Sequence, residues 1–238
     1  MMLMKDAHRR FTEKRRTGGT KMELSEGLRT RHSVRAFLDR PVEAETLRRI
    51  IGAACRAPSA GNMQPWELYA VRGQTMERLR SVVRATFESG GSAPQSPGLA
   101  KPAPEVYSER RRGLYREADP YLQRAGRSGE FIPEGSYRFF GAPAAVLVYV
   151  HEDLLPLRLV CCGAFMTQLT LAAHAEGLGT CAIGFVRTAD RQMREVLSVP
   201  EEFSFVVALA VGYPDPQSPV NEFRSSRVPV DEVCRFFD

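Results

Sequence analysis

The sequence lacks most of the short motifs that identify metal, hydrolytic and nucleotide sites. Its four histidines form no H-E-x-x-H segment, and its five cysteines form no C-x-x-C pair. No G-x-S-x-G segment, no G-x-G-x-x-G turn after a strand and no Walker A segment is present. These absences argue against a zinc enzyme, a serine hydrolase, a Rossmann dinucleotide site and a P-loop site.

A long hydrophobic run is also missing. The longest one, residues 142–150, has nine residues, whereas a membrane-spanning helix needs about 20. An odd number of cysteines without a secretory signal favours reduced thiols. We therefore expect a cytoplasmic protein that has no membrane partner.

Lysine is scarce after residue 21, where only Lys101 follows. Residues 1–21 hold seven Lys and Arg against two acidic residues, and the rest of the chain balances 26 basic against 26 acidic residues. The formal charge of +5 therefore belongs to this segment, and we predict no nucleic-acid partner. We expect residues 1–21 to be a disordered basic extension, although the spacing of Leu3, Ala7 and Phe11 also suits an amphipathic targeting helix.

Residues 22–238 are expected to form a single domain of the α+β class. Hydrophobic periodicity predicts helices near residue 24 and over 42–57, 74–88, 157–176, 189–197 and 230–237, and strands over 66–71, 144–150, 180–185 and 203–213. These elements do not alternate regularly, so we predict a central mixed, mostly antiparallel sheet flanked by helices. The apolar helix at 157–176 suits either a core or a dimer interface.

The segment 89–140 is interpreted as a lid insertion. Residues 89–104 are rich in Gly, Pro and Ser, and residues 105–140 are rich in charge and aromatic side chains. A long insertion of this kind in a compact domain is often functional. We predict a loop followed by one or two helices, whose aromatic residues could be lid core or a platform for substrate.

Arginine provides the clearest chemical signal. Arg31 and Arg35 lie four residues apart with His32 and Ser33 between them, and Arg227 is a third candidate in the irregular tail. Guanidinium groups donate to phosphate in a planar, charge-assisted fork. Three arginines from distant segments are therefore suited to binding a dianionic phosphate.

Several segments resemble the FMN-dependent nitroreductase family. Residues 31–37 (RHSVRAF) resemble its N-terminal flavin motif, and residues 57–66 (APSAGNMQPW) resemble its P-S-x-x-N-x-Q-P-W segment. Residues 177–185 (GLGTCAIGF) resemble the strand beside the flavin ring, and residues 211–214 (VGYP) resemble the terminal strand. The resemblance covers residues 24–238.

The resemblance implies a nitroreductase-like fold and an interlocked homodimer with two FMN sites at its interface. In that arrangement the ribityl phosphate is held by Arg31, His32, Ser33, Arg35 and Arg227. The partner chain lines the flavin ring with Pro58, Ser59, Ala60, Gly61 and Asn62, Gln64 belongs to the same segment, and Ile183 and Gly184 lie by the reactive edge.

The resemblance also implies an oxidoreductase with a ping-pong mechanism through flavin N5. NADH or NADPH would be the electron donor, and a nitroaromatic compound, a quinone or a similar flat electrophile would be the acceptor. No protein residue would be prominent as an acid or base. Relatives carry a lysine at the flavin pyrimidine, and that role must fall here to an arginine or be absent. Ile183 also stands where some relatives carry an acid.

Two other functions remain open. A flavin reductive dehalogenase of the iodotyrosine deiodinase type shares the fold, but its lid resembles an ordered Glu, Tyr, Lys set. Here Glu105 and Tyr107 follow Lys101. A flavin-binding protein without turnover would keep the site and lose the activity. Oxidation of NAD(P)H by purified protein would separate the last possibility.

Overall fold

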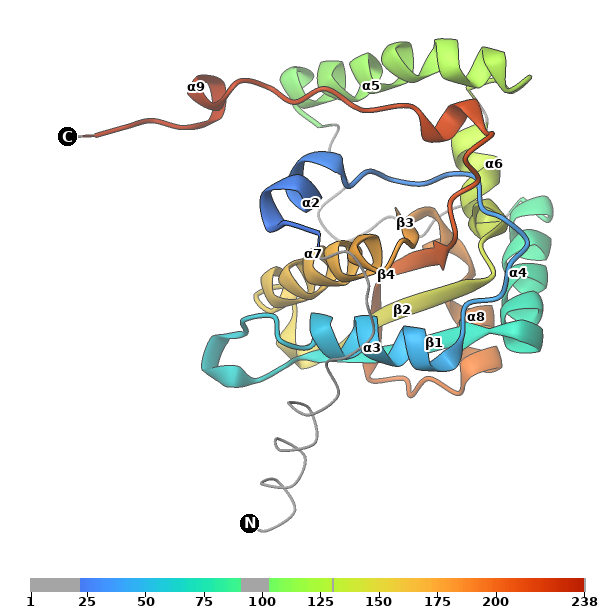
Figure 1. The fold of residues 1–238 in the computed structure, drawn as a ribbon. Coiled ribbons are helices and arrows are strands. Elements are labelled where there is room, and N and C mark those ends of the chain that lie inside the picture. Colours follow the sequence, from blue (N-terminus) through green and yellow to red (C-terminus); the bar gives the residue numbers. More distant parts are fainter. Residues whose placement is uncertain (1–21, 91–102, 130, 238) are drawn as a thin grey trace.

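A four-stranded sheet forms the centre of the molecule (Figure 1). The computed structural model describes residues 22–90, 103–129 and 131–237. The expected N-terminal extension and most of the expected loop at 89–104 lie outside these ranges. The strands are ordered β1 (Trp66–Arg72), β2 (Ala144–His151), β4 (Phe203–Gly212) and β3 (Gly179–Ile183), and each neighbouring pair is antiparallel. The sheet is therefore antiparallel throughout, and the prediction of a mostly antiparallel sheet is confirmed; the parallel contact of Ser33 with Thr180 is an isolated bridge outside the named strands.

Helices cover both faces of the sheet because successive side chains of its strands point to opposite sides. On β2, Ala145, Leu147 and Tyr149 belong to one hydrophobic cluster, and Val146, Val148 and Val150 belong to the other. The first cluster is covered by α4 (Gly73–Glu88), α6 (Phe131–Tyr137) and α8 (Asp190–Leu197). The second is covered by α3 (Ala44–Ala54) and α7 (Leu159–Ala175).

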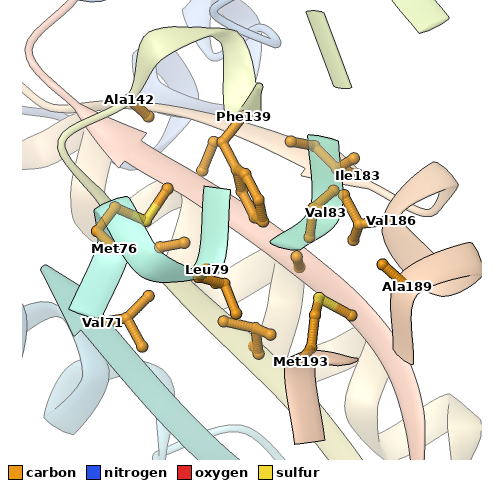
Figure 2. Close-up of a cluster of buried hydrophobic side chains, with 14 of the residues drawn as sticks. Val71, Met76, Leu79, Val83, Phe139, Ala142, Ile183, Val186, Ala189 and Met193 are labelled. Atoms are coloured by element: carbon orange, nitrogen blue, oxygen red, sulfur yellow. The ribbon is translucent and has the colours of Figure 1, made fainter. Parts of the chain in front are cut away.

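The first cluster is closely packed (Figure 2). Met76, Leu79 and Val83 on α4 are fully buried against Phe139 and Met193. On the opposite face, α7 buries its Phe165 and Leu169, so this helix is a core element. At its beginning, however, the exposed fraction of Val160 is 73%, so this end of α7 is not covered by the described residues.

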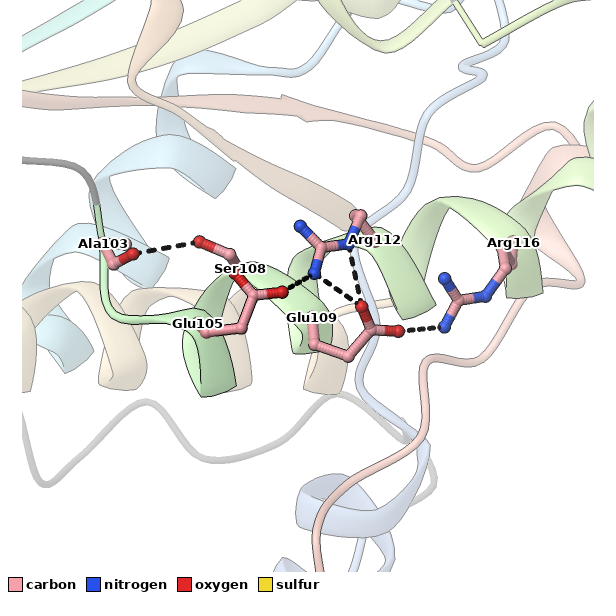
Figure 3. Close-up of polar contacts among 6 residues, drawn as sticks. All are labelled: Ala103, Glu105, Ser108, Glu109, Arg112 and Arg116. Atoms are coloured by element: carbon pink, nitrogen blue, oxygen red, sulfur yellow. Dashed lines mark hydrogen bonds and ion pairs between the residues drawn. The ribbon is translucent and has the colours of Figure 1, made fainter.

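The predicted insertion contains two helices that behave differently. Helix α6 joins the main core, whereas α5 (Glu105–Arg124) lies apart from the sheet beside the C-terminal tail (Figure 1). Ala118 and Leu122 of α5 pack against Val220 and Phe223 of that tail in a third, smaller cluster. The first half of α5 carries ion pairs on its surface (Figure 3), in which Arg112 contacts both Glu105 and Glu109.

Most predicted elements are present with shifted ends. The helix α2 (Leu24–Thr30) is short, and α3 stops at Ala54, before the Pro58 that limited the predicted helix. Strand β3 runs from 179 to 183, so Gly184 lies after it. The helix predicted over 230–237 is only one turn, α9 (Val230–Val233). Short 3-10 turns at 60–62, 139–141, 152–154, 185–189 and 219–221 complete the fold. None of the helices in the described ranges has the length and hydrophobicity needed to cross a membrane.

Candidate functional site

The segment after α2 is fixed to the sheet and to the tail by its backbone. The Val34 amide donates to Thr180 O at 2.9 Å, and the Val34 side chain is buried against Gly179. A Cβ atom at Gly179 would lie 2.5 Å from Val34 Cγ2, so only glycine permits this approach. Asn221 Oδ1 accepts from the amides of Arg35 at 2.9 Å and Ala36 at 3.2 Å. Residues 31–36 are therefore held between β3 and the tail.

A pocket of about 490 Å³, called here the arginine pocket, opens between this segment, α5 and the tail. The structure brings together in its wall the predicted residues Arg31, His32, Ser33, Arg35 and Arg227. The remaining wall residues were not predicted from the sequence: Leu28, Arg29, Thr30, Leu114, Phe223, Arg224 and Ser225. Arg224 could have been recognised, because it lies only three residues before Arg227 in the segment FRSSR.

The arginine pocket has a strongly positive potential. Five arginines line it, and none of them forms an ion pair with an acidic side chain of the described residues. Burial lowers the pKa of Arg31, and the nearby charge of Arg227 lowers it further. Arg227 is held by Ser225 and Ser226, whose oxygens accept from its Nη1 at 2.7–3.0 Å. A site of this kind favours a multiply charged anion.

Two histidines adjoin the arginine pocket. His32 Nδ1 lies 3.1 Å from Thr30 O, and His174 Nε2 on α7 lies 2.8 Å from Thr30 Oγ1. Burial is the main reason that the pKa of each imidazole is lowered, and Arg224 and Arg31 lower both further. Both rings also line a smaller pocket of about 160 Å³ behind the arginine pocket.

Arg35 separates the arginine pocket from a second cavity of about 520 Å³, called here the adjoining cavity. Its wall includes Phe131 and Arg138 of the lid insertion and the loop at 215–220. The Nε atom of Arg35 is buried without a hydrogen-bond partner among the described residues. Arg138 is exposed and forms no ion pair within the described residues.

The second predicted segment does not line the arginine pocket of its own chain. Pro58, Ala60, Gly61, Asn62 and Gln64 are exposed, and Ser59 is half-buried. The segment forms a tight turn in which Gly61, Asn62 and Gln64 have φ angles of 64°, 53° and 49°. Ser59 Oγ accepts from the Gln64 amide at 3.0 Å, and Gln64 Nε2 donates to Asn62 O at 3.0 Å. Gln64 thus stabilises an exposed turn that does not line the arginine pocket of its own chain.

Ile183 and Gly184 lie outside both pockets, and they differ in how far they are exposed to solvent. The Ile183 side chain is 1% exposed and belongs to the core, so only its backbone can face a ligand at the surface. Gly184 is exposed, and Phe185 next to it is 46% exposed. The Phe185 ring lies 6.4 Å from that of Tyr137, which stacks on Phe87 at 3.8 Å. An aromatic surface therefore follows the end of β3.

The described residues contain no group of three or more His, Cys, Asp or Glu side chains that could hold a metal ion. All five cysteines are described, and each is a free thiol.

The aromatic residues of the lid insertion have separate environments. Tyr121 packs on Phe223 with ring centroids 5.5 Å apart, whereas Tyr107 is 57% exposed.

Comparisons with known proteins agree with this geometry. The model of the nitroreductase family matches residues 28–213. Nitrobenzene nitroreductase from Ectopseudomonas oleovorans is 30% identical over 88% of this chain and 94% of its own, and 4-nitrobenzoate reductase from Nocardioides sp. (strain LMS-CY) is 31% identical over 88% and 87%.

Two solved structures extend the similarity to three dimensions. The FMN- and NADPH-dependent nitroreductase NfnB from Sphigopyxis sp. strain HMH superimposes with a TM-score of 0.80, at 29% identity over 91% of this chain and 100% of that one. The FMN-dependent nitroreductase NfnB from Mycobacterium smegmatis, in complex with NADPH, gives 0.79 at 26% identity, over the same two shares.

Proposed function

The chain belongs to the nitroreductase family, and we propose that it is an FMN-dependent oxidoreductase that uses NADH or NADPH to reduce nitroaromatic compounds. The observation that carries this proposal is the arginine pocket. Five arginines, from the last turn of α2, the segment after it and the tail, converge on about 490 Å³ without an acidic partner among the described residues. The named activities of the relatives support the choice of a nitroaromatic acceptor.

The chemistry of these donors fits the ribityl phosphate of FMN. Arg31, Arg224 and Arg227 supply charge-assisted donors, and Ser33 supplies a hydroxyl group, in the wall of one pocket. The phosphate would offset the burial and the repulsion by Arg227 that together lower the pKa of Arg31. Bound FMN would supply hydride chemistry, accepting a hydride from the nicotinamide and passing it to the acceptor in a ping-pong cycle. The protein would hold and orient the reactants.

We assign the flavin ring to the side of the arginine pocket that Arg35 shares with the adjoining cavity. Arg35 has a buried Nε without a hydrogen-bond partner among the described residues, and Arg138 lines the same adjoining cavity. After residue 21 the sequence contains a single lysine, Lys101. We therefore propose that Arg138 supplies the cation at the flavin pyrimidine. The exposed backbone of Gly184, beside Phe185, would then face the reactive edge.

The proposed active form is a homodimer. Large apolar side chains are exposed on the protomer at α2, at the beginning of α7 and on the tail, including Leu24 at 68%, Val160 at 73% and Phe237 at 91%. Exposed apolar surface of this extent is typical of a protein interface. The turn at 58–62 does not line the arginine pocket of its own chain. In the proposed dimer it would reach the flavin ring of the partner protomer.

The experiment is to purify the protein, record its absorption spectrum, measure its mass in solution and follow its anaerobic reduction by NADH and NADPH. We expect a yellow dimer with about one FMN per chain that oxidises NAD(P)H and then reduces nitrobenzene or 4-nitrobenzoate. Protein that stays colourless after incubation with FMN would refute the proposal. Bound FMN that NAD(P)H does not reduce would indicate a flavin-binding protein without turnover, and dehalogenation of halotyrosines without nitroarene reduction would indicate a reductive dehalogenase.

A further inference from the structure

The hydrogen bond at His32 determines which of its ring nitrogens carries a proton. Nδ1 lies 3.1 Å from the Thr30 backbone carbonyl, which can only accept a hydrogen bond. Nδ1 must therefore carry the hydrogen. In a neutral imidazole the other nitrogen, Nε2, is then an acceptor without a proton, and no hydrogen bond from Nε2 to a described residue is formed.

The Thr30 side chain holds a second imidazole in a defined state. Thr30 Oγ1 donates to Glu26 O at 2.8 Å, so its lone pair accepts from His174 Nε2, which is 2.8 Å away. The Nε2 hydrogen of His174 is therefore used in the bond to Thr30 and is not available to an anion in the arginine pocket. This bond fixes the end of α2, from which the Thr30 carbonyl orients His32.

Most of the charged groups around His32 are arginines. Arg31 lies beside it in sequence, Arg224 faces it from the tail, and His174 faces it from α7. Arg29, Arg35 and Arg227 line the same pocket, and Leu114 is the residue that α5 contributes. Glu26 of α2 is the acidic group nearby, and it acts on His174. Burial and the neighbouring cations lower the pKa of His32 and so favour its neutral imidazole.

A phosphate dianion offers only acceptor oxygens to the arginine pocket. Neutral His32 would turn a lone pair on Nε2 toward it, and two acceptors repel. One added proton removes the conflict, whether it resides on Nε2 or on a phosphate oxygen. We propose that His32 binds the cofactor phosphate by sharing one proton with it, so that FMN binding at neutral to alkaline pH takes up a proton from solution.

This inference rests on the proposed function and goes one step further, because the arginines alone would bind the phosphate without proton uptake. Riboflavin lacks the phosphate and provides the internal reference. Free FMN phosphate is a dianion at about pH 8, since its second pKa is about 6. We therefore expect uptake of about one proton per FMN at this pH and of none per riboflavin.

The test is isothermal titration calorimetry of the apoprotein with FMN and riboflavin in buffers of different ionisation enthalpy. His32→Gln replaces the imidazole with an amide whose NH₂ group can donate to the phosphate without taking up a proton from solution. The proton uptake should therefore fall to near zero, while riboflavin affinity stays unchanged. His151→Gln is the matched control, because His151 lies at the end of β2 and lines neither of the two pockets. It should keep the uptake of the unmodified protein.

The pH dependence gives an independent measurement. The ratio of FMN affinity to riboflavin affinity should rise by up to about tenfold per pH unit as pH falls from about 9 to about 7, and this slope should be flat in His32→Gln. FMN binding without proton uptake, or equal uptake in His32→Gln, would refute the inference alone. Failure of both flavins to bind would refute the proposed function together with it.

Discussion

Replacement of Arg227 with alanine isolates the phosphate end of the proposed flavin site. Arg227 lines the arginine pocket and has no acidic partner among the described residues, so its removal leaves no buried carboxylate unpaired. A charge-assisted hydrogen bond contributes roughly 1.5–3 kcal/mol, which corresponds to about a ten- to hundredfold change in affinity. Arg227 is exposed on the protomer, and solvent screening places the expected loss toward the lower end.

Fluorescence titration of the apoprotein with FMN and with riboflavin measures this effect. Arg227→Ala should weaken FMN and leave riboflavin nearly unchanged, because only FMN carries the phosphate. The difference should shrink as salt concentration rises. Arg235→Ala is the matched control, since Arg235 lies on the same tail, donates to Asp231 O and does not line the arginine pocket. Equal weakening of both ligands, or the same effect from Arg235→Ala, would refute the assignment of Arg227 to the phosphate.

Three further predictions address the ring, the lid and the histidines. Arg138→Ala should weaken FMN and riboflavin by the same factor, about tenfold for one charge-assisted hydrogen bond; a loss confined to FMN would contradict its placement at the pyrimidine. Residues 105–113 of α5 should exchange amide hydrogens faster than the sheet and gain protection when a nicotinamide analogue or a nitroarene binds. Full protection without ligand would instead identify this half of α5 as fixed structure. The apoprotein should lose stability as pH falls from above about 6.5, because the folded state holds the pKa of His32 and His174 below the unfolded value and the unfolded chain takes up protons first. Urea unfolding of the apoprotein at about pH 7.5 and about pH 5.5 measures this loss, and His174→Gln should reduce it.

Strong local patterns made most of the fold predictable. The continuous apolar runs of β2 and α7 identify core elements because both reflect burial of contiguous segments. The ends were less predictable, since tertiary contacts set them. The helix predicted over 230–237 shortens to one turn, and its apolar residues, such as Val233 at 61% exposure, pack into none of the three clusters of the described residues.

The site was predictable where one segment carries several donors, as residues 31–35 do. The site was less predictable where residues in contact come from distant parts of the chain. Asn221 holds the backbone of Arg35 and Ala36 across 186 and 185 residues of sequence, and no local pattern indicates this contact. The pairing of His174 with Thr30 is likewise created by the packing of α7 against the end of α2. The assignment of residues 58–64 to the flavin ring stays a prediction, because that contact would be made with the partner protomer of the proposed dimer.

The tail is synthesised after the rest of the fold, and this order determines when the phosphate-binding arginines become available. Both large hydrophobic clusters are complete once β4 has been made, whereas Arg224 and Arg227 come later in the chain. Cofactor capture is therefore expected to be a late event on a nascent protein whose sheet is already folded. A translational stop between Gly212 and Phe223 would leave the residues of both large clusters in place but remove Arg224 and Arg227, so we expect the shortened product to bind FMN poorly, and the yellow colour of a preparation would report how much of the polypeptide had been finished.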